Sequence, residues 1–260
     1  MKRLLAALLL ASSATLALAG RDCAQEAPQA RNVERAMVLA ERTARALDAT
    51  GARVVVLARA GQDLSDHGLR YSHLGLAYRE ERAGRPVWRV VHKLNQCGTA
   101  HAALHRQGLG EFFLDDLHEY QAGYVVLRPE VQAQLAPLLA DNRRVAQLHT
   151  PRYNMVAYPW AQTYQQSNQW ALETLALAMD EQASTRERAQ AWLRLHGYVP
   201  TTLRVSPFKR LGARATAAHI AFDDHPNAKR YANRIETVTV DSVFAWLTAQ
   251  GLAGPMQSVR

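Results

Sequence analysis

The chain has 260 residues, of which 48% are hydrophobic and 21% are charged, which is enough apolar content for one sizeable globular domain. Its formal net charge is +8, but the arginines are scattered through both halves without a basic block. This pattern argues against nucleic-acid binding and supports only a mild attraction to anionic polymers of the cell envelope.

The first nineteen residues have the features of a secretory signal peptide. Met1-Lys2-Arg3 is a short basic region, residues 4–18 are apolar, and Ala17-Leu18-Ala19 is a small-x-small cleavage signal. The apolar run is too short for a membrane span, and no later window is apolar enough to cross a bilayer. We therefore expect cleavage after Ala19 and a periplasmic or secreted protein. Residues 20–260 then form a single domain, with a C-terminal extension after about residue 195.

The chain has two cysteines, Cys23 and Cys97. In an oxidising compartment the expected arrangement is a disulfide, which would stabilise the fold by about 4 kcal/mol in the chain-entropy model. The alternative is a catalytic thiol at Cys97, in the segment Asn95-Gln96-Cys97-Gly98. A bridged cysteine cannot be a nucleophile, so each interpretation excludes the other.

The hydrophobic pattern of the N-terminal half predicts one helix followed by an antiparallel hairpin. Apolar residues at helical spacing favour a helix over 30–50, and the β-branched run at 53–60 favours a buried strand. Two further strands are predicted over 71–78 and 87–94. Gly84-Arg85-Pro86 is a turn signal between them, which indicates a hairpin.

The C-terminal half alternates predicted helices with short strands. The predicted elements are a loop or short helix at 111–120, a strand at 122–127, a helix from Pro129 to about 141, an aromatic loop at 153–164, helices at 168–179 and 186–195, β-like pieces at 219–222 and 235–240, and a helix at 241–247 capped by Asp241. No repeat or linker interrupts them. The expected fold is one compact α+β domain.

Two histidines on the predicted hairpin are candidates for a general base and its orienting partner. His73 lies on the first strand, and Gly75 two residues later would allow a close approach of backbone or substrate. His92 lies on the second strand and, with suitable pairing, faces the same side as His73. The alternative is that each is a packed, hydrogen-bonded core residue.

Ser167 precedes a strongly helical segment and has two possible roles. Serine is a preferred N-cap, and capping alone would explain its position. A nucleophile at a helix start would also lie beside the positive end of the dipole and free amides that can hold an oxyanion. Its hydroxyl would then depend on His73 as the base.

The other polar and aromatic residues give weaker signals. His101 and His105 are four residues apart, as on one helix face, but no third ligand accompanies them, so neither a metal nor a cofactor is expected. Aromatic side chains are dense between 153 and 170. They either line a substrate groove or clamp a buried loop, and they are Tyr153, Tyr158, Trp160, Tyr164 and Trp170.

Five segments together resemble a bacterial family of exported proteins catalogued as domain of unknown function 2145. They are Tyr-Ser-His-Leu-Gly at 71–75, Lys-Leu-Asn-Gln-Cys-Gly at 93–98, Gln-Gly-Leu-Gly-Glu-Phe-Phe at 107–113, Tyr-Asn-Met-Val-Ala-Tyr-Pro-Trp at 153–160 and Ser-Asn-Gln-Trp-Ala-Leu-Glu at 167–173. The resemblance covers nearly all of the chain after the signal peptide. The family name carries no activity.

The pattern in turn looks like the circularly permuted, NlpC-type branch of the papain-like fold. This resemblance implies that His73 is the base, His92 the orienting group and Tyr153-Asn154 the approach to the site, with Ser167 at the nucleophile position. The chain departs from that fold in having serine where the fold uses cysteine. The remaining expected substrate-binding residues are Tyr71, Tyr164, Asn168 and Trp170.

Two functions follow from this departure. In the first, the protein is a cell-envelope hydrolase of amides, peptides or esters that uses Ser167. In the second, catalysis is lost and the module binds an envelope peptide or lipid. A purely structural protein in which Ser167 only caps its helix is the third possibility.

Overall fold

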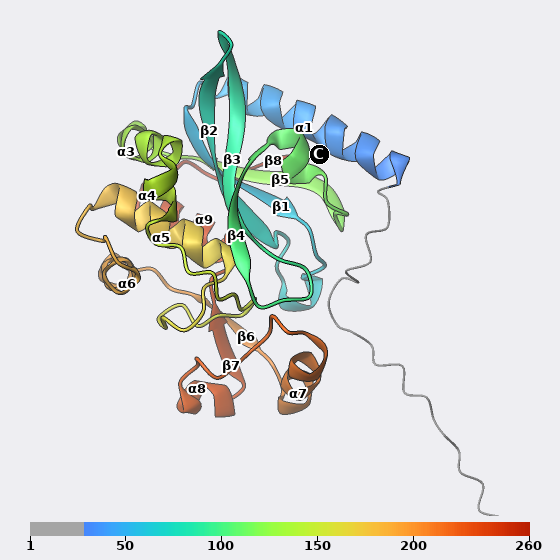
Figure 1. Ribbon diagram of the computed structural model, residues 1–260, viewed down its shortest axis with the longest axis vertical. Coiled ribbons are helices and arrows are strands. Elements are labelled where there is room, and N and C mark those ends of the chain that lie inside the picture. Colours follow the sequence, from blue (N-terminus) through green and yellow to red (C-terminus); the bar gives the residue numbers. More distant parts are fainter. Residues whose placement is uncertain (1–28) are drawn as a thin grey trace, which may run out of the picture.

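A six-stranded antiparallel sheet forms the centre of the molecule (Figure 1). The computed structural model describes residues 29–260. The expected signal peptide, its cleavage after Ala19, and Cys23 therefore lie outside the described residues. The strand order is β4-β3-β2-β1-β5-β8. The strands are β1 (Val54–Ala60), β2 (His73–Arg82), β3 (Arg85–Asn95), β4 (Ala102–Gly108), β5 (Glu119–Val126) and β8 (Gln257–Val259).

The predicted hairpin is confirmed and is longer than its hydrophobic pattern suggested. β2 and β3 pair from Leu76 opposite Val91 to Arg82 opposite Arg85. The turn consists of Ala83 and Gly84, both with positive φ, as a two-residue turn of type I′ requires. The predicted turn Gly84-Arg85-Pro86 was wrong in its extent, because Arg85 and Pro86 are already paired in β3. The pairing places consecutive side chains of each strand on opposite faces of the sheet.

One face of the sheet is covered by α1 (Ala30–Ala49) and α2 (Leu109–Phe113). α1 is amphipathic, and its buried residues recur every three or four positions, which is the spacing that turns one stripe of a helix toward a sheet. Its stripe packs with Phe112 and Phe113 of α2 against alternate residues of β1, β2 and β3. In Figure 1 these two helices lie on the right of the sheet.

The other face carries the larger hydrophobic core. The helices that cover it are α3 (Pro129–Ala140), α4 (Asn142–Ala146), α5 (Ser167–Met179), α6 (Arg186–Leu195) and α9 (Val240–Ala249). Twelve of the thirteen residues of α5 are buried, so this helix is enclosed on all sides rather than lying at the surface. α5 therefore brings its first residues to the interior, beside β2 and β3.

The region after Leu195 contributes to two parts of the molecule. α9 packs in the large core and β8 pairs with β5 at the sheet edge. Between α6 and α9 the chain forms a separate two-stranded sheet with two short helices, at the lower end of Figure 1. Its elements are β6 (Thr201–Arg204), α7 (Pro207–Thr216), α8 (Asn227–Tyr231) and β7 (Arg234–Thr237). We call this part, residues 201–237, the lower lobe.

The expected α+β class, with an antiparallel sheet packed against helices, is confirmed, but several local predictions were wrong. His105 lies on strand β4 and not on a helix, so His101 and His105 share no helix face. Residues 219–222 form no strand. The last helix begins at Val240 and is capped by Thr239, whose hydroxyl accepts from the Ser242 amide, and not by Asp241.

Candidate functional site

The two histidines that the sequence singled out lie side by side. His73 Nε2 is 2.8 Å from His92 Nδ1, and the rings meet edge to face with centroids 5.1 Å apart. Gly75 makes this approach possible, because a Cβ atom there would lie 3.2 Å from His92 Cβ and 2.5 Å from Val90 Cγ1. The orienting role expected of His92 therefore has the geometry that it requires.

A chain of hydrogen bonds fixes the protons on both rings. Gln107 Nε2 donates to Glu111 Oε1 over 3.1 Å, which turns Gln107 Oε1 toward His92 Nε2 at 2.7 Å. His92 Nε2 therefore carries the proton and donates it, and His92 Nδ1 accepts from His73 Nε2. This leaves His73 Nδ1 as the unprotonated nitrogen, which is the atom that a general base needs.

Both imidazoles are held neutral. Burial lowers the pKa of His92 to about 3, with a further contribution from the positive charge of Arg59. Burial, and then the charges of Arg59 and His92, lower the pKa of His73 well below its ordinary value. Arg59 is itself buried, pairs with Asp115 at 2.9 Å and donates to the carbonyl of Phe112. At neutral pH both rings are therefore unprotonated, and burial opposes their protonation.

The start of α5 enters the sheet where β2 and β3 separate. The two strands are paired only from Leu76 onward, so the amide of Leu74 has no partner on β3. Asn168 Oδ1 accepts from that amide at 3.0 Å, and Asn168 Nδ2 donates to the carbonyl of Ser72 at 3.4 Å. Asn168 therefore binds the backbone on both sides of His73, and Ser167 is its neighbour in the chain.

Ser167 is the first residue of α5 and does not cap it. Gln166 is the N-cap: its side chain accepts from the Asn168 amide, and Gln169 Oε1 accepts from the Gln166 amide in return. The expectation that the Ser167 hydroxyl caps the helix was wrong. That hydroxyl is hydrogen-bonded to Tyr153, whose pKa is raised to about 12 by burial. Within residues 29–260 no hydrogen bond joins Ser167 to His73.

The start of α5 is also bound to the lower lobe. Gln166 Nε2 donates to Thr237 Oγ1 at 2.6 Å, and the Thr237 hydroxyl donates to the carbonyl of Ala157 at 3.3 Å. Asn168 Nδ2 is 3.4 Å from the carbonyl of Val238. The residues on both sides of Ser167 are thereby held by the end of β7.

The other expected substrate-binding residues make contacts within the protein. Tyr71 is buried and accepts from Gln121, while Trp170 is fully buried and donates to the carbonyl of Val145. Asn154 is fully buried and holds the segment around Ala221 through two hydrogen bonds. Tyr164 donates to Asp223 at 3.2 Å. A role of these residues in substrate binding stays a prediction.

Cys97 follows β3, and the described residues contain no free cysteine. The alternative in which Cys97 is a catalytic thiol therefore has no support in this part of the chain. The pairing of Cys97 with Cys23 stays a prediction, because Cys23 lies outside the described residues.

Gln107, Glu111 and Arg59 are site residues that the sequence reasoning missed. Gln107 and Glu111 stand in the segment Gln-Gly-Leu-Gly-Glu-Phe-Phe at 107–113, so the signal was present in one of the motifs used for the family resemblance. Their role was hidden because β4 was not predicted. Arg59 is a charged residue inside a buried strand. Arginine is rarely buried unless it is paired, so its position in the β-branched run was a signal of a polar site.

Comparison with protein-family models agrees with this arrangement of motifs. Residues 46–247 match the family described as "Uncharacterized protein conserved in bacteria (DUF2145)". The chain belongs to this family. The match contains β1 to β5, α5 and the lower lobe, and therefore includes His73, His92, Gln107 and Ser167. Membership of this family confirms the resemblance drawn from the five motifs.

No curated protein and no solved structure matches the chain. In the described part of the chain, no three His, Cys, Asp or Glu side chains gather as ligands for a metal ion. Within residues 29–260, none of the helices combines the length and the apolar character that crossing a bilayer requires.

Proposed function

We propose that this protein is an exported hydrolase of the cell envelope that cleaves amides, peptides or esters, with Ser167 as nucleophile and His73 as base. The observation that carries the proposal is the hydrogen-bond chain from Glu111 through Gln107 and His92 to His73. Such a chain leaves a half-buried imidazole with one unprotonated nitrogen and a fixed orientation.

His73 contacts His92 and Phe112 on the α2 face of the sheet, whereas Ser167 opens α5 on the other face and is hydrogen-bonded to Tyr153, so the proposed reaction requires the two side chains to turn toward each other at the start of β2. His73 Nδ1 then takes the Ser167 hydroxyl proton as Oγ adds to the substrate carbonyl carbon. The tetrahedral oxyanion accepts from amides at the start of α5 other than that of Asn168, which is bonded to Gln166 Oε1. His73 then returns the proton to the leaving nitrogen or oxygen as its bond to carbon breaks. Water, deprotonated by the same His73, hydrolyses the acyl-Ser167 ester.

The permuted papain-like resemblance supports this assignment of roles. In that arrangement the base and its orienting residue come from two neighbouring strands, and the nucleophile opens a buried helix. His73 begins β2, His92 lies on β3 and Ser167 is the first residue of α5, in that chain order. Serine in place of cysteine makes the base more important, since a serine hydroxyl is hardly ionised at neutral pH.

A second candidate is a non-catalytic module that binds an envelope peptide or lipid. It is favoured by the state of Ser167, whose side chain is buried at 7% exposure and hydrogen-bonded to Tyr153. If this second function is correct, the two neutral histidines line part of a binding site and do not accept a proton from Ser167.

A fluorophosphonate probe, which modifies activated serines covalently, separates the two candidates. We expect the probe to label Ser167, and we expect Ser167→Ala to abolish labelling. His73→Gln should slow labelling at least about a hundredfold, because the base is lost. Ser65→Ala is the matched control, since Ser65 is exposed and its hydroxyl donates to Asp63. A folded wild-type protein that does not react would contradict catalysis and leave the binding module.

The variant Ser167→Cys tests the geometry without a known substrate. A thiol at this helix start, with His73 as its partner, should have a lowered pKa and react with iodoacetamide below pH 7. In the double variant with His73→Gln, the reaction should move toward the pH range of an ordinary thiol. Identical pH profiles of the single and double variants would show that His73 does not reach position 167.

A further inference from the structure

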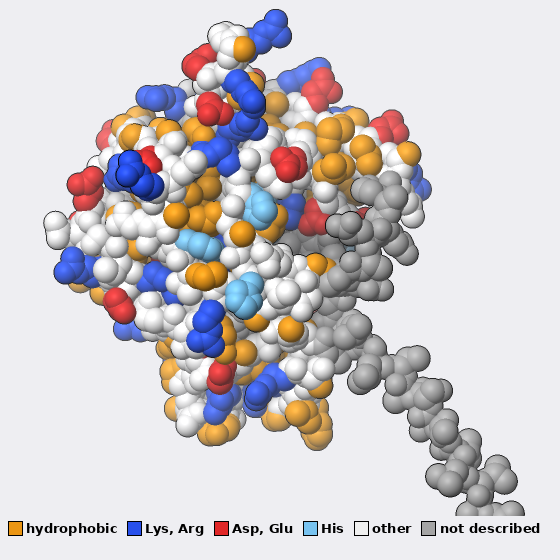
Figure 2. All heavy atoms as spheres, viewed as in Figure 1, with side chains coloured by type: hydrophobic (Ala, Val, Ile, Leu, Met, Phe, Trp, Pro, Cys, Tyr) orange, Lys and Arg blue, Asp and Glu red, His pale blue; other side chains and the backbone are white. Residues whose placement is uncertain are grey.

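The lower lobe exposes large apolar side chains next to basic ones. On α7, Phe208 is 87% and Leu211 68% exposed, and their spacing of three residues puts them on one face of the helix. On α8, Tyr231 is 70% exposed. Soluble proteins rarely leave several such side chains together in water. Figure 2 shows hydrophobic side chains gathered at this lower end of the molecule, with lysine or arginine above them.

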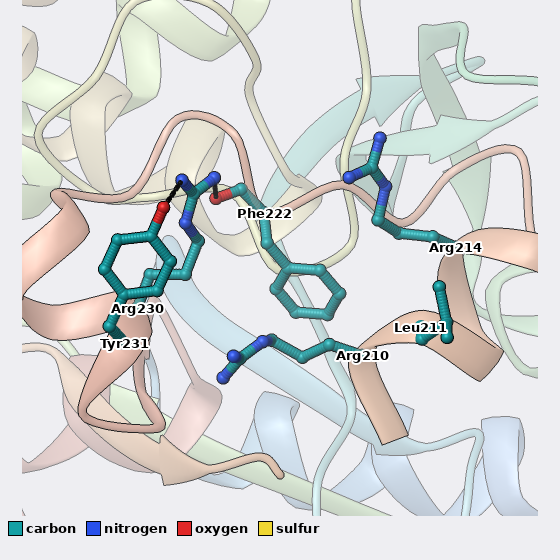
Figure 3. A pocket seen from close by; sticks show the side chains of 6 residues that line it. All are labelled: Arg210, Leu211, Arg214, Phe222, Arg230 and Tyr231. Atoms are coloured by element: carbon teal, nitrogen blue, oxygen red, sulfur yellow. Dashed lines mark hydrogen bonds between the residues drawn. The ribbon is translucent and has the colours of Figure 1, made fainter. Parts of the chain in front are cut away.

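A hollow of about 280 Å³ lies between the two helices (Figure 3). Its apolar lining comes from Leu211, Phe222 and Tyr231, and its charged lining from Arg210, Arg214 and Arg230. Arg230 is anchored by Asn227 and lies over the Tyr231 ring, 5.1 Å from its centroid. Arg214 is exposed and forms no ion pair with any residue in 29–260. An apolar hollow ringed by guanidinium groups suits an amphiphile with a negative head.

The charge on this surface has one sign. α7 and α8 contain five basic residues, Lys209, Arg210, Arg214, Lys229 and Arg230, and no acidic one. Of the neighbouring carboxylates, Asp224 is bound by His225 and the Tyr158 amide, Glu236 pairs with Lys229, and the exposed Asp223 accepts from Tyr164. We call the exposed surface of α7 and α8 the basic-apolar pole. Glu236 compensates Lys229, whereas within residues 29–260 the other four basic side chains of the pole form no ion pair with a carboxylate.

We propose that the basic-apolar pole docks onto the surface of an anionic phospholipid bilayer. Phe208, Leu211 and Tyr231 would enter the boundary between headgroups and acyl chains, while the lysine and arginine side chains bind lipid phosphates. Apolar side chains without charge would suit a protein partner, and charge without apolar side chains would suit a soluble polyanion. The combination on one short, amphipathic helix favours a lipid surface. This inference does not depend on the proposed hydrolase.

The test is co-flotation of the protein, purified after export from a bacterial host, with vesicles of defined composition. We expect binding to vesicles of phosphatidylcholine with 30 mol% phosphatidylglycerol and much weaker binding to pure phosphatidylcholine. Raising NaCl from 50 to 500 mM should weaken the binding, because salt screens the attraction. Equal binding to both kinds of vesicle, or none to either, would overturn the proposal.

Variants test whether the basic-apolar pole is the surface that binds the vesicles. Phe208→Asp should lower vesicle affinity at least about thirtyfold, since one buried aromatic side chain is lost. Lys209→Gln with Arg214→Gln should lower it roughly twentyfold and reduce its salt dependence. The controls are Met256→Asp, at an exposed apolar residue by the main sheet, and Arg82→Gln with Arg85→Gln, at the tip of the β2–β3 hairpin. Controls that weaken binding as much as the pole variants would overturn the assignment.

Two further outcomes would replace the bilayer with another occupant. If the protein is a dimer in solution and Phe208→Asp makes it monomeric, the pole covers a second copy of the chain. If inorganic phosphate protects the lobe from proteolysis but vesicles do not bind, the hollow is a site for a soluble anion. Either result contradicts docking on a bilayer.

Discussion

Two neighbouring residues of β3 belong to two different polar regions on opposite faces of the sheet. His92 faces α2 and forms the histidine pair with His73, next to Phe112 at a ring-centroid distance of 5.1 Å. Lys93 faces α5, and its Nζ donates to the carbonyls of Thr150 and Gln165 at 2.6 and 2.8 Å. Both side chains are fully buried. A single strand therefore carries an ionisable group into each of the two cores.

The two regions differ in how their charge is compensated. Around Lys93 lies a closed network in which the buried Glu173 accepts from Arg186 at 2.9 Å and from Gln165, Gln169 and Gln190. Around His73 there is no carboxylate of this kind, and the final basic nitrogen is left without a described partner. Complete satisfaction is typical of structural networks, whereas a free basic atom in a buried site is typical of chemistry. The comparison therefore favours the histidine side over the Lys93 side as the place of the proposed chemistry.

The strongest test of this difference removes the centre of the closed network. Glu173→Ala leaves the guanidinium of Arg186 buried without its partner, and we expect the free energy of unfolding to fall by about 3–5 kcal/mol. Urea denaturation followed by tryptophan fluorescence measures it. The matched control is Glu181→Ala, because Glu181 is an exposed partner of Arg144 and should change stability by less than about 0.5 kcal/mol. A loss below about 1 kcal/mol for Glu173→Ala would contradict a structural role.

Lys93 should make the protein more stable as pH rises. Burial, and then the charge of Arg186, lower its pKa to about 6 in the folded state, against 10.5 for an unperturbed lysine. Between these values the unfolded chain binds more protons, so stability increases with pH by up to about 1.4 kcal/mol per unit. Urea melts at pH 6, 7, 8 and 9 measure the slope. Lys93→Met should flatten it, and an unchanged slope in this variant would contradict the assignment.

His92 should change the stability of the protein at lower pH than Lys93 does. Its pKa of about 3 in the folded state lies below the ordinary value of 6.5, so the folded state resists protonation that the unfolded chain accepts. Stability is therefore complete above about pH 6.5 and falls by a few kcal/mol between pH 6.5 and 3. Acid unfolding midpoints in His92→Gln should shift to lower pH than in wild type. His105→Gln, at an exposed position on β4, serves as the control.

The sequence predicted the main elements where one physical signal dominated. The β-branched run of β1 and the alternation in the hairpin specified both strands, and helical spacing with Gly197 beyond the end specified α6. The approach of His73 and His92 could be predicted only on condition of a suitable register, because side chains of paired strands alternate with a period of two and the sequence does not give the register.

Elements with polar or mixed sequences were missed. β4 contains His105, Arg106 and Gln107 at the edge of the sheet, where no hydrophobic alternation is required, and the spacing of His101 and His105 imitated a helix face. Gln107 was lost with its strand. The N-cap of α5 is a glutamine, which is not among the residues that usually signal a cap, so Ser167 was considered as one candidate for the role that Gln166 performs.

The hydrogen bonds from Gln166 to Thr237 and from Asn168 to Val238 make the start of α5 a joint between two functions. The end of β7 and the residues that flank Ser167 are thus hydrogen-bonded to each other. The lobe is therefore not an interchangeable module: a grafted or redesigned lobe would have to reproduce these two bonds to keep Ser167 in place. Substitutions in the lower lobe that break these bonds are then expected to alter the position of Ser167 as well as the candidate docking surface.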